Sequence, residues 1–150
     1  MNSRPVIAGT NQGKLLNVLG DGITVQVHGN DTGGSLAVCI ASGHPGHGPP
    51  PHIHSREDET FHVLEGEIEG FVGSQSFKLT AGMTAFLPRN IPHTYRVAGT
   101  QPARFLVVLS PAGFERFFEE VGAMSKKEQQ NIPRIVELGR QYGLEFLSPQ

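Results

Sequence analysis

Short runs of β-forming residues, each followed by a turn former, fill most of the chain up to residue 110. The chain contains 19 glycines and 11 prolines, which interrupt it often. No helical pattern separates the runs, and short strands at this spacing form antiparallel sandwiches or barrels. We therefore expect one small β-barrel over about residues 15–110 of a single 150-residue domain. The runs cover residues 23–27, 36–40, 60–64, 66–72, 75–79, 84–87, 94–97 and 103–109.

The pattern changes to helical after residue 110. Ser110 and Pro111 are typical of a helix cap followed by proline at the first helical position. Phenylalanines and a valine then recur at positions 114, 117, 118 and 121, and a capping box at Ser125 precedes a second apolar face from about Ile132. We expect a tail of two short helices over about residues 111–143. Its phenylalanine stripe is expected to pack against the barrel; closing a site or forming dimer contacts are the alternatives.

Two histidines and a glutamate stand close together in residues 51–59. Side chains two positions apart on a strand point to the same face, so His52 and His54 can both point inward. A turn over residues 55–58 would let Glu59 point inward from the next strand, and this turn is expected to be solvated. Imidazole and carboxylate donors on one face suit iron, manganese, cobalt, nickel, copper or zinc. We expect one divalent transition metal here.

His93 is the fourth candidate ligand. It follows Pro88-Arg89-Asn90, which is typical of a turn because asparagine tolerates the left-handed conformation better than most residues. This turn would bring His93 onto a neighbouring strand.

The two histidine segments resemble the two motifs of the cupin superfamily. The first motif is a glycine, a His-x-His pair, a glutamate and a second glycine at fixed spacings, and it is matched throughout by Gly46, His52, His54, Glu59 and Gly66. The second motif is matched at its glycine, proline and histidine by Gly82, Pro88 and His93. Asn90 replaces a glycine and Val97 an asparagine, and neither change removes a ligand. The resemblance implies an all-β, double-stranded β-helix (jelly-roll) barrel, here with a short C-terminal helical tail.

Residues 59–66 and the helical tail are also similar to single-domain cupins related to quercetin 2,3-dioxygenase. The resemblance implies a metal-dependent oxidoreductase, a dioxygenase that acts on a small oxygenated organic substrate. Glu59 would be a ligand and also the catalytic residue, since a carboxylate that loosens from the metal can take a substrate proton. A metal-dependent isomerase or lyase and a non-catalytic small-molecule binding protein are the alternatives, because this fold supports many functions. Dimers are common among cupins, so we expect a homodimer.

The remaining observations limit the partners and the location. A net charge of −2 provides no strong field for nucleic acid or an anionic membrane. The single cysteine, Cys39, lies in an apolar run and is expected to be a buried core residue rather than a catalytic thiol. The absence of a signal peptide and of a disulfide favours a cytoplasmic protein.

The sequence also predicts the positions of four further side chains. His44 and His47 are expected on an exposed loop, with a place at the rim of the site as the alternative. His62 should point away from the metal by strand alternation. Tyr95 could line the cavity or pack in the core.

Overall fold

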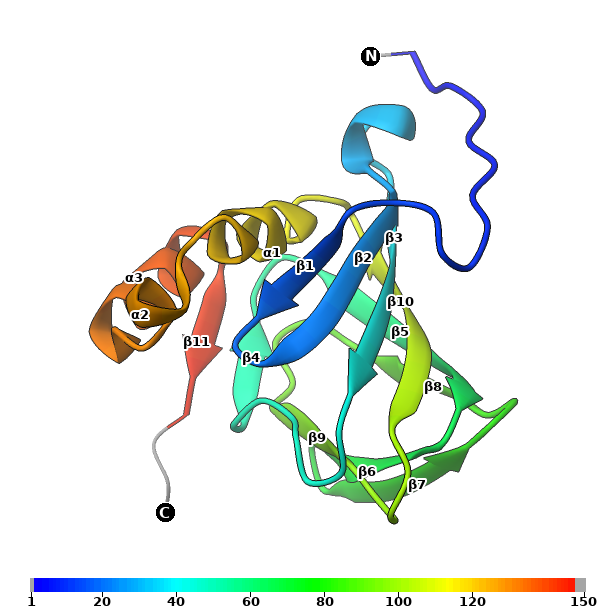
Figure 1. The fold of residues 1–150 in the computed structure, drawn as a ribbon, viewed down its shortest axis with the longest axis vertical. Helices are drawn as coiled ribbons and strands as arrows, with labels where there is room; N and C mark the ends of the chain where they lie inside the picture. Colours follow the sequence, from blue (N-terminus) through cyan, green and yellow to red (C-terminus); the bar gives the residue numbers. More distant parts are fainter. Residues whose placement is uncertain (1, 148–150) are drawn as a thin grey trace.

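The computed structural model describes residues 2–147 and contains two antiparallel sheets that face each other, with short helices beside one end (Figure 1). One sheet has six strands in the order β1-β2-β3-β10-β5-β8, and the other has five in the order β11-β4-β9-β6-β7. The predicted jelly-roll fold is confirmed. The strands are β1 (Leu15–Val18), β2 (Asp21–Val27), β3 (Ala37–Gly43), β4 (His52–His54), β5 (Asp58–Glu65), β6 (Glu67–Val72), β7 (Gln75–Thr80), β8 (Thr84–Leu87), β9 (His93–Val97), β10 (Ala103–Ser110) and β11 (Leu144–Phe146).

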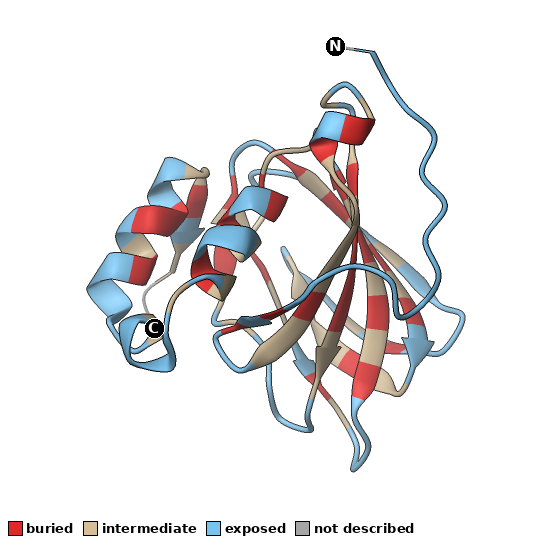
Figure 2. Cartoon of the chain, turned by 45° about the horizontal axis from the view of Figure 1, so that its top comes forward, coloured by how far each residue is buried: buried red, intermediate tan, exposed pale blue. Residues whose placement is uncertain are grey.

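Strand β10 shows how the sequence builds the core. Alternate residues of this strand are buried: Ala103, Phe105, Val107 and Leu109. It pairs with β3 on one side and with β5 on the other, so it lies in the interior of the six-stranded sheet. Figure 2 shows the same alternation of buried and more exposed residues along the strands. The space between the two sheets therefore holds the apolar side chains, Cys39 among them, as expected.

The tight hairpin predicted at Gly73-Ser74 is present. Val72 of β6 lies opposite Gln75 of β7, which leaves a two-residue loop between the strands. Gly73 has a φ of 58°, a conformation that glycine adopts without a steric penalty.

The C-terminal segment contains three helices rather than the expected two. They are α1 (Glu115–Gly122), α2 (Lys126–Gln129) and α3 (Ile132–Gln141). The predicted capping box is confirmed, because Ser125 Oγ accepts a hydrogen bond from Glu128 N at 3.2 Å and Glu128 Oε2 accepts one from Ser125 N at 2.7 Å.

The predicted helix start at Ser110-Pro111 is wrong, because α1 begins only at Glu115. The Glu115 carboxylate is buried and accepts hydrogen bonds from the backbone N–H groups of Gly29 (3.0 Å) and Gly113 (2.6 Å). These contacts tie the chain before the helix to the turn around Gly29–Asp31, so the segment after Ser110 stays irregular. Both ends of the single domain predicted over residues 1–150, residue 1 and residues 148–150, lie outside the described residues.

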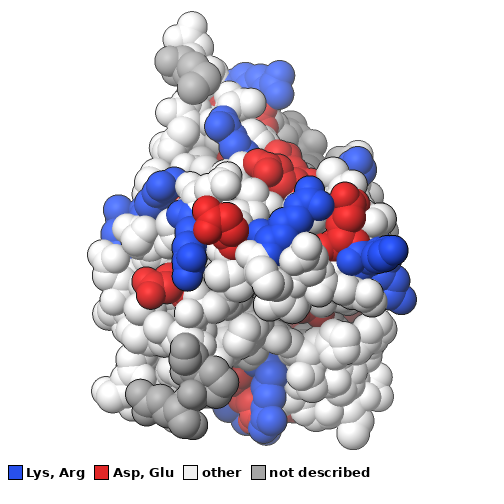
Figure 3. Space-filling model, turned by 90° about the vertical axis from the view of Figure 1, so that its left-hand side faces the viewer, with Lys and Arg blue, Asp and Glu red and all other residues white. Residues whose placement is uncertain are grey.

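Charged side chains of both signs are interspersed over the face that carries the C-terminal helices (Figure 3). Some form ion pairs there, such as Arg134 with Glu128 at 3.3 Å. Within residues 2–147, no helix combines the length and the apolar character that a membrane span requires.

Candidate metal centre

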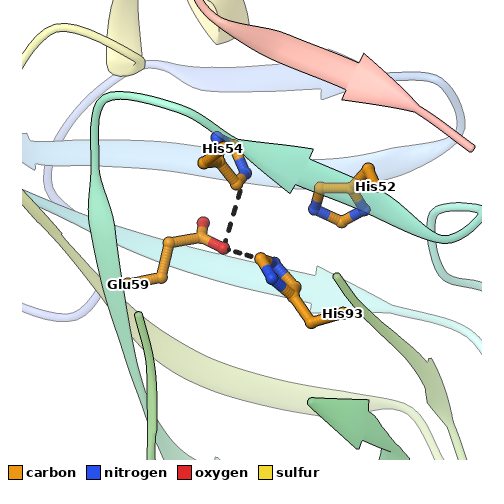
Figure 4. Close-up of side chains that lie close together, drawn as sticks. All are labelled: His52, His54, Glu59 and His93. Carbon is orange, nitrogen blue, oxygen red and sulfur yellow. Dashed lines mark hydrogen bonds and ion pairs between the residues drawn. The ribbon is translucent and has the colours of Figure 1, made fainter. Parts of the chain in front are cut away.

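The four candidate ligands come from three strands in two sheets. His52 and His54 lie on β4 and His93 on β9, and these strands of the five-stranded sheet pair at His52 and His93. Glu59 lies on β5 of the facing sheet. The alternation rule places both β4 histidines on the inner face, as expected. Figure 4 shows the side chains converging between the sheets.

The donor atoms of these side chains lie close together. The Nε2 atom of His93 is 2.8 Å from Oε2 of Glu59, and Nε2 of His54 is 3.5 Å from the same oxygen. The His52 and His93 rings are 4.3 Å apart between centroids. One donor atom from each residue can be chosen so that all lie within 4.8 Å of one another. Each of the four residues is at most 5% exposed.

Two of the imidazoles have a backbone acceptor behind them. The Nδ1 atom of His52 is 2.9 Å from the carbonyl oxygen of Pro50, and Nδ1 of His93 is 3.3 Å from that of Ile91. A proton on Nδ1 would satisfy these contacts and leave Nε2 as the free lone pair. The side chains are therefore oriented for ligation through Nε2.

The protonation state of the cluster also matches that of ligands. Burial lowers the pKa of His52 to about 4, and the neighbouring His93 and His54 act in the same direction. Burial opposes ionisation of Glu59, but the histidines around it outweigh this and bring its pKa to about 2. The His52 imidazole is thus neutral and the Glu59 carboxylate charged near neutral pH, the forms that bind metals. The donor set of imidazole nitrogens and a carboxylate oxygen fits a divalent transition metal.

The turn before His93 has the predicted chemistry. Asn90 has a φ of 64°, in the left-handed region, and its N–H donates to the carbonyl of His54 at 2.7 Å. This bond ties the turn to β4. Asparagine thus fills the glycine position of the motif because it tolerates the same backbone conformation.

Gly66 shows why the first motif ends in glycine. Its φ is 75°, and a Cβ atom there would lie 2.5 Å from the carbonyl oxygen of Pro102. A larger residue would push β5 away from the start of β10.

A cavity of about 420 Å³ opens beside the cluster, and three of the candidate ligands line it: His52, His54 and Glu59. Its other walls are almost entirely apolar. Phe61, Phe105 and Tyr95 pack ring against ring with centroids 5.1–5.5 Å apart. Burial raises the pKa of Tyr95, so its hydroxyl keeps its proton. Tyr95 thus has both of the roles considered for it, because its ring packs against core residues and also lines the cavity.

The C-terminal segment supplies much of this wall. The Phe114 ring lies 4.5 Å from the His54 ring, edge to face. The phenylalanine stripe thus packs against the sheets, as expected, and also borders the cavity. The lining residues from this segment are Phe114, Phe117, Phe118, Ile132, Ile135, Val136, Leu144 and Phe146.

Other predicted side chains lie outside the cluster. His47 is half-exposed on the loop, with Nδ1 at 3.3 Å from Oδ1 of Asp21, and Asp21 borders the cavity. His62 contacts Thr84 Oγ1 through Nδ1 at 2.8 Å on the outer side of β5. The prediction of a solvated turn over residues 55–58 is wrong for Glu57, which is only 3% exposed.

Sequence reasoning missed two contributors to the site. Strand β11 pairs with β4, placing Phe146 opposite His52, but its three residues show no strand pattern of their own. Glu57 was missed because a charged residue between Arg56 and Asp58 is typical of a solvated turn.

Comparison with known proteins agrees with this geometry. A family model described as "Cupin domain" matches residues 40–109. Quercetin 2,3-dioxygenase of Bacillus subtilis (strain 168) is 32% identical over 92 residues, which cover 61% of this chain and 27% of that protein. Polyketide synthase CurC of Streptomyces cyaneus is 30% identical over 80 residues, covering 53% of this chain and 51% of that protein. The chain thus spans between about a quarter and a half of the length of these curated relatives.

A solved structure, an RmlC-like cupin from Shewanella frigidimarina NCIMB 400, superposes with a TM-score of 0.64. The superposition covers 77% of this chain and 99% of the other. The sequence identity is 19%, so the likeness concerns the fold.

Proposed function

Because this chain belongs to the cupin superfamily, we propose that it is a metal-dependent oxidoreductase of the dioxygenase type. One divalent transition metal would be held by His52, His54, Glu59 and His93. The observation that carries the proposal is the buried cluster of three imidazoles and one carboxylate in the wall of an apolar cavity. The likeness to quercetin 2,3-dioxygenase supports the reaction type.

A bound redox metal would supply open coordination positions for dioxygen and for a chelating substrate. Other residues of the chain shape the surroundings of this metal and orient its ligands. The apolar walls exclude water, and the carbonyls of Pro50 and Ile91 hold two imidazoles in place. Glu59 is our candidate for accepting a substrate proton. Its Oε2 atom contacts His93 and His54, and these contacts must loosen before the carboxylate becomes basic enough.

The cavity also favours one class of substrate. Among the described residues that line it there is no lysine and no arginine, and the acidic ones are Asp21 and Glu59. A phosphate or carboxylate group on a substrate would therefore find no positively charged side chain in the cavity wall. Aromatic rings of Phe61, Phe105 and the C-terminal segment instead offer stacking contacts. We infer an uncharged aromatic substrate with neighbouring oxygen atoms that can chelate the metal.

Oxygen consumption tests the proposal. The protein is loaded in turn with iron, manganese, nickel, cobalt and copper, and each form is mixed with flavonols and with aliphatic enediols. We expect uptake with the flavonols for at least one metal. No uptake for any pairing would contradict the dioxygenase reaction.

A metal-dependent isomerase or lyase is the second candidate, because the same four donors and apolar cavity could hold a metal that acts without oxygen. Such an enzyme would convert an aromatic substrate without consuming oxygen. Mass spectrometry of products formed under nitrogen separates the two reactions. Tight binding without conversion would indicate a binding protein.

The homodimer and the cytoplasmic location remain predictions. Sedimentation equilibrium at micromolar concentration checks the dimer, and a clean monomer would contradict it.

A further inference from the structure

Glu57 is a buried carboxylate that the proposed reaction does not use. It lies in the turn between β4 and β5, and both of its neighbours in sequence bind other partners. The guanidinium of Arg56 donates to the carbonyl of Gln141 at 3.0 Å, and Asp58 pairs with Arg89 at 3.0 Å. Glu57 points inward between these two anchors and is 3% exposed.

The carboxylate faces the back of a candidate ligand. Its Oε2 atom is 3.8 Å from Nδ1 of His54, whose Nε2 lies on the Glu59 side. In the part of the chain that the structure describes, these two are the only buried side-chain nitrogen or oxygen atoms without a hydrogen-bond partner. Leaving both unpaired is unfavourable, and a small movement of either side chain would bring them within hydrogen-bond distance.

The other two imidazoles show what this contact would do. Behind His52 and His93, Nδ1 faces a backbone carbonyl, from Pro50 and Ile91 respectively. Behind His54 the facing acceptor is the side chain of Glu57 instead of a backbone carbonyl. A carboxylate behind a ligating histidine fixes its tautomer and raises its basicity.

We propose that Glu57 is the positioning residue of His54. The Glu57 side chain accepts the Nδ1–H of His54, so that Nε2 of His54 is presented to the metal. The inference rests on the proposed metal site and adds to it a residue that touches neither metal nor substrate.

Zinc binding, measured by competition with a chromophoric chelator, provides the first test. Glu57→Gln keeps an acceptor but removes the charge, whereas Glu57→Ala removes both. We expect zinc affinity to fall about tenfold in Glu57→Gln and up to about a hundredfold in Glu57→Ala, the range found for such outer partners. Equal affinity in wild-type protein and both variants would overturn the proposal.

Glu115→Gln is the matched control. Glu115 is also a buried glutamate, but its carboxylate accepts hydrogen bonds from Gly29 and Gly113 and contacts none of the four candidate ligands in the structure. It should lose thermal stability while its zinc affinity stays within twofold of wild type. A loss of affinity as large as that of Glu57→Gln would mean that general destabilisation is the cause, against the proposal.

The tautomer of His54 provides a readout that a merely structural role would not change. In zinc-loaded protein with ¹⁵N-labelled histidine, nuclear magnetic resonance should show His54 protonated at Nδ1. Its Nδ1–H signal should shift downfield through the bond to Glu57 and lose this shift in Glu57→Ala. A proton on Nε2 would overturn the proposal.

The failure of this inference is distinguishable from failure of the proposed function. Wild-type protein that binds no zinc overturns both. Zinc binding with the predicted Glu57 dependence but without oxygen uptake leaves the positioning role standing and removes only the dioxygenase reaction.

Discussion

Replacing each of the four candidate ligands should affect the site differently. His54 is the most central, since its ring contacts Glu59 on one side and Phe114 on the other. We expect His54→Ala to retain less than about a tenth of an equivalent of metal, because the variant loses one of four donors and the geometry that they form together. Elemental analysis of protein purified without chelator measures this.

His62→Ala is the control for that substitution. His62 lies on the same strand as Glu59 but contacts Thr84 on the outer side. Its metal content should equal that of wild type. A similar loss in both variants would contradict the proposed ligand set.

Acid should act on the metal-free protein through His52. Its pKa in the folded protein is about 4, against 6.5 for an ordinary histidine. Between these values the unfolded chain takes up a proton that the folded chain does not, so acidification through this window lowers the free energy of unfolding. Replacing His52 by glutamine should make the unfolding free energy, measured with urea at pH 7 and pH 5, fall less.

Glu57 acts in the opposite direction in the same experiment. Burial raises its pKa to about 7, so the folded protein binds a proton there before the unfolded chain does, and acidification stabilises it. Because Glu57 is present in both wild type and His52→Gln, its contribution cancels when the pH dependence of the two proteins is compared. If the unfolding free energy falls more between pH 7 and pH 5 in His52→Gln than in wild type, the sign assigned to His52 is wrong.

The backbone at Asn90 allows a further substitution test. Its positive φ should make Asn90→Gly neutral or stabilising, while Asn90→Ala should lower stability by about 1 kcal/mol. Thermal melts of the two variants and wild type measure this. Equal melting temperatures for the glycine and alanine variants would contradict the role of the left-handed turn.

At the scale of strands and helices, the C-terminal segment connects the fold to the cavity. Phe118 on α1 borders the cavity and is only half-buried, so its replacement should leave the fold intact. We expect Phe118→Ala to weaken binding of flavone, a neutral planar probe without the chelating hydroxyl, by about tenfold. The chain has no tryptophan whose fluorescence could report binding, so calorimetry is the suitable measurement.

Phe86→Ala is the corresponding control. Phe86 lies on β8, is 59% exposed, and is not among the residues that line the cavity. Flavone affinity should not change. If both variants bind flavone as tightly as wild type, the C-terminal wall does not contact the ligand.

Local pattern explains why some elements could be predicted and others could not. The His-x-His pair follows directly from the alternation of a strand, and the hairpin at Gly73-Ser74 from turn chemistry. The start of α1 and the strand β11 depend instead on distant partners, Gly29 in one case and β4 in the other. Burial of Glu57 likewise depends on contacts of its neighbours with Gln141 and Arg89, which no short window of sequence contains.

At the scale of the whole molecule, the candidate site connects the two sheets. Glu59 belongs to the six-stranded sheet and the three histidines to the five-stranded one. A metal held by all four would link the sheets, so ligation should stabilise the entire fold. At a free zinc concentration a hundred times the dissociation constant, we expect about 2.7 kcal/mol of added stability.

Differential scanning calorimetry with and without zinc measures this gain. Glu59→Gln removes the only donor from the six-stranded sheet and should lose most of it. A full gain in that variant would show that the metal does not link the sheets.

The division of the cavity between two parts of the chain has an evolutionary consequence. The candidate ligands fall within residues 52–93, inside the stretch that matches the family model, whereas much of the apolar wall comes from residues 114–146, beyond it. Mutations of the cavity-lining side chains in the later segment would therefore change the cavity wall without removing any of the four candidate ligands. Diversification of such proteins would then proceed by exchange of the C-terminal segment, and a chimera that carries the corresponding segment of another cupin should inherit the ligand preference of its donor.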